Sequence, residues 1–241
     1  MALLEFQNAL GRLVRTSGSD QSGSVLLAGE ERACLEALPK TAGFRFTVAV
    51  QRSWCARRAA NAGLLALSIL PDETRRRLLN TWIDAGGGTS SFFAAEADAL
   101  LDFIADQLPE RSPELAVCRL EQRILRANSH AAFFKPPDRA HFDVWRCVRR
   151  GSFAGVVDFH GRPDRVLNGL LRRGSQEASP QDVTPVLVAP GLQALCRIAL
   201  PHEAELWKGL EGPAPTAALV AGGHARGEIE TMLNVGALEY A

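Results

Sequence analysis

The stretch from Val183 to Ala241 restricts the fold of this chain more than any other part of the sequence. Two short apolar runs are separated by Pro190-Gly191. Proline fixes φ and glycine accepts positive φ, so this dipeptide predicts a turn between two strands. Pro201 then predicts a helix start, because a first turn does not need the missing N–H. Two more helices, Pro215–Ala221 and Arg226–Val235, complete a pattern of two strands followed by three helices.

The second strand, over Ala194–Leu200, is expected at the edge of a sheet beside the last helix. An edge strand offers unpaired N–H and C=O groups to which an extended peptide can add, and an apolar helix face can form the adjoining groove. We expect Arg197 to face water. The candidate peptide-binding residues are Leu195, Arg197, Ile198, Ile229, Met232 and Leu233. The alternative is a packed C-terminal subdomain without a binding role.

The N-terminal half predicts helices only. In the longest pattern, Phe46, Val50 and Trp54 recur at helical spacing. The expected helices are Ala2–Arg15, Val25–Leu38, Arg45–Leu70, one that begins at Pro71 and is broken at Gly86, Phe92–Leu108, and Pro113–Asn128.

The pair Pro136-Pro137 cannot continue a helix, because prolines lack the N–H donor and restrict the preceding residue. We therefore expect a helical domain over residues 1–130 and a smaller domain over 131–241. In the second, His141–Arg149 and Ser152–Phe159 predict strands and Pro163–Arg173 predicts a helix. The fold class is α+β: an all-helical domain followed by a small winged-helix-like domain.

Charge and cysteine content limit the possible classes of protein. Lys+Arg and Asp+Glu are both 27, and a chain of zero net charge is not typical of a dedicated nucleic-acid binder. Low net charge favours association with a partner subunit. The five cysteines are scattered without a CxxC pair, which indicates reduced thiols in a cytoplasmic protein. We see no signal peptide and no membrane-spanning run.

Few residues suggest chemistry within this chain. His141 with Asp143, or Asp158 with His160, could share a strand face, but a metal site needs more ligands than either pair supplies. Cys147 near His141 could be a nucleophile and base. Hydrogen-bonded or solvated side chains explain these pairs more simply. We therefore predict no catalytic residue, no metal ligand and no cofactor in this chain, and an enzyme using one of these sites is a remaining alternative.

A winged-helix outline also permits DNA binding, with the second or third helix of the module as the reader. The last helix begins Arg226-Gly227-Glu228 and contains Glu230. Both acidic side chains would meet phosphate repulsion, which disfavours this alternative.

Several segments, in this order, resemble the HvfC-like proteins, which include partner subunits of multinuclear iron enzymes that modify ribosomally made peptides. The similar segments are Phe6–Leu10, Val50–Leu70, Phe92–Leu108, Leu115–Glu121, Pro163–Arg172, Pro185–Val188, Ile198–Pro201 and His202–Leu210. The resemblance is one of pattern over most of the chain.

The resemblance implies a division of labour. Iron would belong to a separate TIM-barrel enzyme, and this chain would bind the leader of a precursor peptide and present its cysteine to that oxygen-using partner. The length and the helical N-terminal part are similar to the subunits of 3-thiaglutamate pathways, with those of methanobactin pathways also related. The expected partners are the iron enzyme subunit and the precursor peptide, with no nucleic acid and no membrane.

Overall fold

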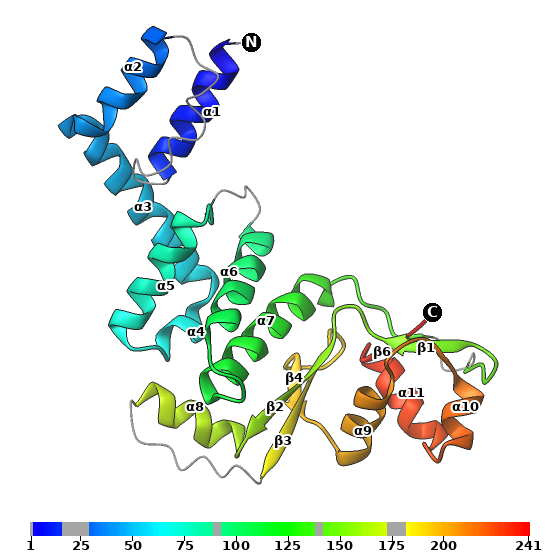
Figure 1. Cartoon of the computed structure of the whole chain (residues 1–241). Helices are drawn as coiled ribbons and strands as arrows, with labels where there is room; N and C mark the ends of the chain where they lie inside the picture. Colours follow the sequence, from blue (N-terminus) through cyan, green and yellow to red (C-terminus); the bar gives the residue numbers. More distant parts are fainter. Residues whose placement is uncertain (1, 16–28, 89–92, 138–141, 173–181) are drawn as a thin grey trace. The chain divides into compact units, whose positions relative to one another are not determined.

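The computed structural model describes residues 2–15, 29–88, 93–137, 142–172 and 182–241. It is a mixed α+β fold with two small antiparallel sheets, as the sequence predicts at that level (Figure 1). The chain divides into two compact units, Met1–Phe103 and Ile104–Ala241. The division expected at residue 130 stays a prediction, because compactness alone does not show which part folds independently.

Unit 1 is helical throughout its described part. Its elements are α1 (Ala2–Arg15), α2 (Gly29–Ala37), a 3-10 turn (Leu38–Lys40), α3 (Ala42–Ala62), α4 (Leu64–Ser68), α5 (Asp72–Asp84) and the first part of α6 (Phe93–Gln107). The single helix expected over Arg45–Leu70 is wrong, because Gly63 ends α3 with φ −114° and ψ 54°. A Cβ on Gly63 would lie 3.2 Å from the Leu101 side chain, so α6 requires a small residue there.

The buried face of α3 is not the one that its largest apolar residues form. Phe44 and Val48 pack with Ala9 and Leu13 of α1, in a cluster that also contains Leu35. By contrast, Phe46, Val50 and Trp54 are 70%, 51% and 51% exposed. The same helix therefore has a buried apolar face and a second, exposed apolar face.

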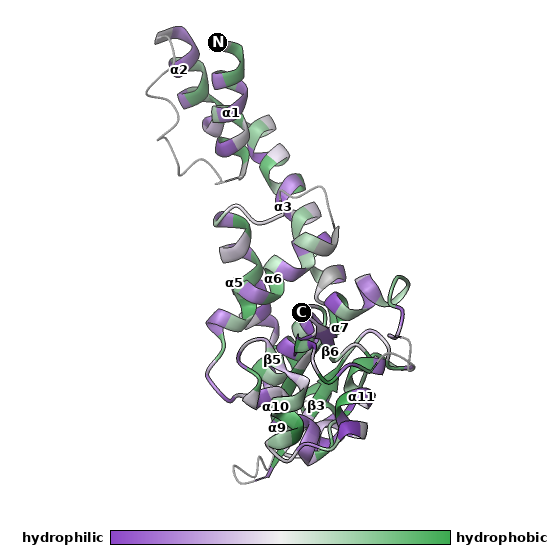
Figure 2. Cartoon of the chain, turned by 90° about the vertical axis from the view of Figure 1, so that its right-hand side faces the viewer, coloured by the Kyte–Doolittle hydropathy of each residue, from purple (hydrophilic) through white to green (hydrophobic). Residues whose placement is uncertain are grey.

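Unit 2 contains the end of α6 and then α7 (Pro113–Ala131), whose first turn is capped by Ser112 accepting from the Leu115 N–H. The first sheet has the order β2 (Gly155–His160), β3 (Val183–Val188), β4 (Cys196–Ile198). It lies between α7 and α9 (Pro201–Gly209) in Figure 1, and the ribbon beside the β3 label is largely hydrophobic in Figure 2. Helix α8 (Pro163–Leu171) follows β2.

The second sheet has the order β5 (Ala214–Pro215), β1 (Cys147–Arg150), β6 (Leu238–Tyr240). Of these strands, only β1 is expected from the sequence. The last helix, expected over Arg226–Val235, is confirmed as α11 (Arg226–Asn234). After it the chain returns as β6 beside β1, a strand that the sequence does not predict. Three residues are too few for an alternating pattern to be recognised.

The core of unit 2 joins both sheets to α9, α10 (Thr216–Ala221) and α11. It contains Val148, Ala154, Leu187, Ala189, Ala199, Ala204, Leu206, Trp207, Leu210, Ile229, Met232, Leu233, Ala237 and Leu238. The helix start expected at Pro201 is confirmed, and α9 buries Leu206 and Trp207, with Leu210 buried directly after its end. None of the described helices combines the length and apolarity needed to cross a membrane.

Gly151 tests the packing between β1 and β6. Its N–H donates to the Ala237 carbonyl at 2.8 Å, and an added Cβ would lie 2.3 Å from the Gly236 carbonyl oxygen. Because that contact is with backbone, we expect Gly151→Ala to lower the free energy of unfolding by about 1–3 kcal/mol. Urea denaturation measures the change.

The control is Gly227→Ala in α11, where an added Cβ meets nothing within 4 Å. A helical glycine in open space should gain about 0.5–1 kcal/mol on replacement by alanine. Equal effects of the two substitutions would contradict the packing described for Gly151.

Candidate functional site

The candidate site is the free edge of β4. Strand β4 pairs antiparallel with β3, with Arg197 opposite Leu187. On either side, the Ala189 N–H donates to Leu195 O and the Ala199 N–H donates to Pro185 O, both at 2.9 Å. Since backbone groups alternate along an antiparallel strand, Arg197 bonds toward β3, and Cys196 and Ile198 direct their N–H and C=O groups outward. The Ile198 carbonyl there accepts a hydrogen bond from the Arg197 guanidinium at 3.1 Å and keeps one lone pair for a further donor.

This edge is shorter than the predicted strand over Ala194–Leu200. Leu195 has a φ of 60°, a left-handed conformation that is uncommon for leucine, and its N–H donates to Leu192 O. At the other end the Leu200 N–H donates to the Glu203 carboxylate at 2.9 Å. Only Cys196–Ile198 therefore remains in position to pair with another strand.

Two side chains give this edge its chemical character. Ile198 is 60% exposed although it is a large apolar residue in a strand. Burial raises the pKa of the Cys196 thiol, so this cysteine stays protonated at neutral pH. The edge thus has an exposed apolar side chain and a neutral thiol, and Cys196 lacks the lowered pKa of a reactive thiolate.

Arg197 is predicted to face water, but its side chain is only partly exposed. Its guanidinium binds the Glu203 carboxylate through two nitrogens, at 2.7 and 2.5 Å, and Glu203 is almost fully buried. Burial alone would raise the pKa of Glu203, but the Arg197 hydrogen bonds and the Leu200 N–H outweigh it and lower that pKa. The pair fixes β4 to the first turn of α9.

The opposite end of α9 is held by charges from both sheets. Arg150 of β1 donates to the carbonyls of Trp207 and Lys208 at 2.7 and 2.9 Å, which satisfies orphan acceptors at a helix C-terminus. Lys208 in turn binds Asp158 of β2 at 2.7 Å. Helix α9 is therefore a fixed support behind the β4 edge.

The α11 residues of the candidate site lie inside the core. Ile229 and Met232 are fully buried and Leu233 is nearly so. They cannot form the wall of an open groove beside β4, as the sequence suggested, because their side chains pack against other core residues. Of the six candidates, the exposed member at the edge is Ile198, and a peptide-binding role for any of them stays a prediction.

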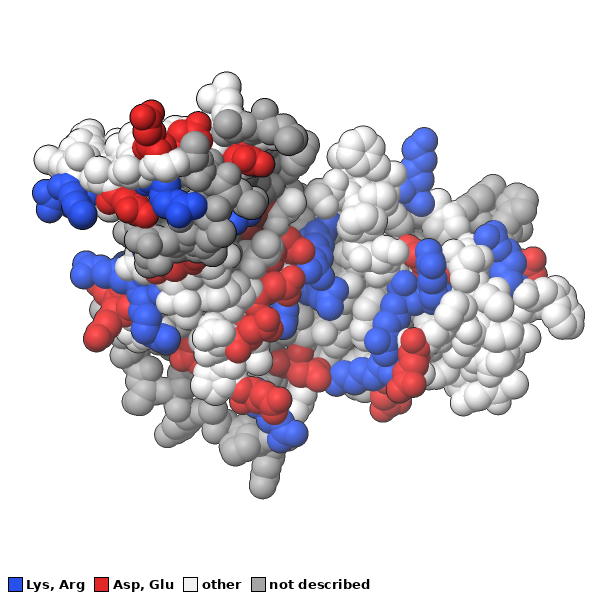
Figure 3. All heavy atoms as spheres, turned by 45° about the horizontal axis from the view of Figure 1, so that its top comes forward, with Lys and Arg blue, Asp and Glu red and all other residues white. Residues whose placement is uncertain are grey.

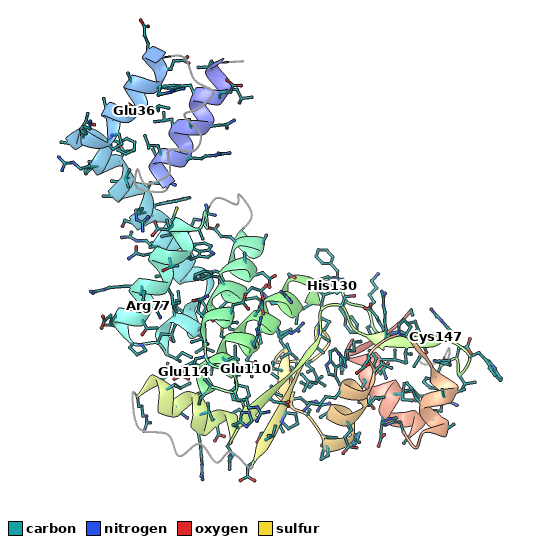
Figure 4. The ribbon with its side chains drawn as sticks, viewed as in Figure 1. Glu36, Arg77, Glu110, Glu114, His130 and Cys147 are labelled. Carbon is teal, nitrogen blue, oxygen red and sulfur yellow. The ribbon has the colours of Figure 1, made fainter. Side chains whose placement is uncertain are left out.

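The alternatives involving chemistry within the chain find little support in the described residues. Asp158 is engaged by Lys208, and Nδ1 of His160 is buried without a described hydrogen-bond partner. Cys147 is half-buried in β1 (Figure 4), and the His141 proposed beside it lies outside the described residues. Within the described ranges, no three His, Cys, Asp or Glu side chains gather as a metal-ligand group.

No disulfide joins the five cysteines, all of which lie in the described ranges; Cys55 and Cys118 are buried, whereas Cys34 is exposed. Comparison with known proteins gives no relative: no family model matches this chain, and no curated protein matches it significantly.

The Arg197–Glu203 pair generates a prediction for acid stability. Folding lowers the pKa of the Glu203 carboxyl from its ordinary value of 4.5. The ionised carboxyl therefore stabilises the folded protein at pH values above 4.5, and this contribution is lost as the pH falls through the lowered pKa. We expect Glu203→Gln to cost about 1–3 kcal/mol at neutral pH, less than a fully buried pair because Arg197 is partly exposed. The difference from wild type should shrink below about pH 4.5.

Urea denaturation at several pH values measures this difference, with Glu205→Gln, an exposed position on the same helix, as the control. A gap between wild type and Glu203→Gln that stays constant down to about pH 2 would contradict the assignment.

Proposed function

We propose that this chain is a non-catalytic recognition subunit with a winged-helix-like C-terminal part. It binds the leader of a ribosomally made precursor peptide and presents the peptide's cysteine to an iron-dependent, oxygen-using TIM-barrel partner. The peptide maturation is of the 3-thiaglutamate type. Iron belongs to the partner, and this chain contributes no cofactor and works in the cytoplasm.

The observation that carries peptide binding is the β4 edge. Cys196 and Ile198 direct backbone donors and acceptors outward, and strand addition needs only such groups and an adjacent side chain for register. The Arg197–Glu203 pair and the N-terminal turn of α9 hold this edge in place before a peptide arrives. A preorganised edge loses little entropy on binding, which favours affinity.

Docking of the partner is supported by the exposed apolar face of α3. Phe46, Val50 and Trp54 lie at i, i+4 and i+8, so they form one continuous stripe. The Arg58 guanidinium lies 4.6 Å from the centroid of the Trp54 ring and limits its motion. An exposed aromatic stripe of this kind is typical of protein interfaces rather than of a free surface.

DNA binding is the second candidate function, and its support is the winged-helix-like order of elements in the C-terminal part. In the face drawn in Figure 3, Lys and Arg side chains alternate with Asp and Glu and do not gather into a single basic patch. Arg226, the single Lys or Arg of α11, binds Glu230 at 2.7 Å and is therefore already paired within the helix. A duplex affinity that falls steeply with salt would favour DNA over the peptide.

Peptide binding at β4 is tested with Ile198→Pro. The Ile198 N–H points away from β3, so proline removes an outward donor without removing a bond of the sheet. We expect a candidate precursor peptide to bind this variant at least about tenfold more weakly than it binds wild type, as judged by calorimetric titration.

The control for this experiment is Ile198→Thr, which keeps the N–H and a β-branched side chain and should lose less affinity. Charged substitutions at Ile229 or Met232 are unsuitable, because they would unfold the core. Undiminished binding by a folded Ile198→Pro protein would exclude the β4 edge.

Partner docking is tested with Trp54→Ala and Phe46→Asp. Co-expression with a TIM-barrel iron protein encoded beside this gene should yield a complex with wild type and little or none with Phe46→Asp, because a charge in the centre of an apolar interface is not compensated. The matched control is Val220→Asp, another exposed apolar residue, on α10. Equal recovery of the complex from all variants would place docking elsewhere.

A further inference from the structure

A cleft of about 470 Å³ lies in unit 2, beside the end of α7 and the second sheet. Its lining comes mainly from the end of α7 with the segment after it, from β1 with the turn that follows, and from β6 with the residues before it. Protein pockets that bind small molecules have volumes of about 300–1,000 Å³. The cleft therefore has the capacity of a small-molecule site, and its lining decides which class of molecule suits it.

The most buried residues of the lining are apolar. Leu233 and Leu238 are 3% and 1% exposed, and Pro190 and Gly236 are buried as well. Because Leu238 is buried to this extent, the outer side of β6 is closed to a pairing strand. A ligand that enters the cleft meets apolar side chains at its floor, so an apolar group suits that end.

Aromatic rings form the walls of the cleft. Phe134 is held beside Gly191 and Gly236, where an added Cβ would lie 2.5 and 2.6 Å from its ring. His130, labelled at the end of α7 in Figure 4, is stacked on Phe153 with ring centroids 4.2 Å apart and an angle of 7° between the ring planes. Phe153 is 37% exposed, so its ring still offers surface to a ligand. Rings that are already ordered favour a flat aromatic ligand, which stacks on them at little entropic cost.

The charges at the cleft favour an anion. Among the described lining residues, Glu239 is the one acid, and its carboxylate already accepts from Arg149 Nε at 2.8 Å and from the N–H and hydroxyl of Ser152 at 3.2 and 2.9 Å. The side chain of Arg149 is half exposed and has two further nitrogens. Lys135 is exposed, and no ion pair is found for it within the described ranges. An anionic group would thus meet two cations, whereas a cation would meet a carboxylate that is already occupied.

We infer that this cleft binds a small aromatic acid, with its ring between Phe134 and Phe153 above the apolar floor and its anionic group at Lys135 and Arg149. The site goes beyond the proposed function and does not depend on it, because leader binding is assigned to β4, in the other sheet. A mononucleotide also combines a flat ring with an anion, but the polar edges of its base would lose hydrogen bonds to water at an apolar floor.

The test uses the full chain and three probes of similar shape: cinnamate, cinnamyl alcohol and cinnamylamine, which end in a carboxylate, a hydroxyl and an ammonium group. Titration followed by NMR chemical shifts measures each affinity, which for ligands of this size should lie in the millimolar range. We expect cinnamate to bind about three- to tenfold more tightly than cinnamyl alcohol at low salt, and cinnamylamine to bind most weakly. The amides of Phe134, Glu239 and Tyr240 should shift.

Lys135→Glu separates the contribution of charge from that of the ring. It should weaken cinnamate binding about three- to tenfold and change cinnamyl alcohol binding by less than about twofold, because only the carboxylate meets the reversed charge. Phe153→Ala should weaken both ligands by a similar factor, about two- to tenfold, since both stack on that ring.

Two matched controls lie outside the cleft. Lys40→Glu reverses an exposed lysine in unit 1, and Phe133→Ala removes an aromatic side chain that is 75% exposed and does not line the cleft. Neither substitution should change the affinity for cinnamate or for cinnamyl alcohol.

Three results would overturn the inference: cinnamylamine binding as tightly as cinnamate, shifts confined to residues outside the cleft, or an equal loss of cinnamate and cinnamyl alcohol binding in Lys135→Glu. Tighter binding of adenosine monophosphate than of cinnamate would also overturn it and would assign the cleft to nucleotides. Leader binding at β4 is tested with Ile198 variants, which leave this cleft intact, so the two proposals fail separately.

Discussion

The bidentate contact between Arg197 and Glu203 is the interaction on which the architecture of unit 2 depends most. Glu203 is buried, so its charge is tolerable only while Arg197 and the Leu200 N–H compensate it. The same carboxylate thereby joins a strand, a helix N-terminus and the turn between them. With Arg150 and Lys208 at the other end, α9 is anchored to both sheets. A helix fixed at both termini makes the two small sheets one structure.

Small sheets leave edges, and unit 2 has two sheets of three short strands each. A three-residue strand such as β4 or β6 has backbone groups on its outer side whether or not it has a function. What differs is the surrounding chemistry. The β4 edge has an exposed isoleucine, and the Arg197 guanidinium donates to the Ile198 carbonyl there. In β6, by contrast, Leu238 is almost fully buried.

In unit 1, helix α3 packs against α1 with one face and exposes apolar side chains on another. Phe44 and Val48 are sufficient to pack α3 against α1. The residues on the other side, Phe46, Val50 and Trp54, contribute nothing to that cluster. One helix thus has two apolar faces, of which one packs on α1 and the other is exposed.

The sequence by itself determined the types and order of most elements: the start of α9 at Pro201, the capping of α7 at Ser112, and the β3–turn–β4 pair. These depend on local backbone chemistry, which neighbouring residues specify. Only the tertiary structure decided that β1 pairs with β6, that Phe44 and not Phe46 is buried, and that Ile229 and Met232 belong to the core. Strand pairing and burial depend on residues far apart in the chain, and periodicity shows that a face is apolar without showing what covers it.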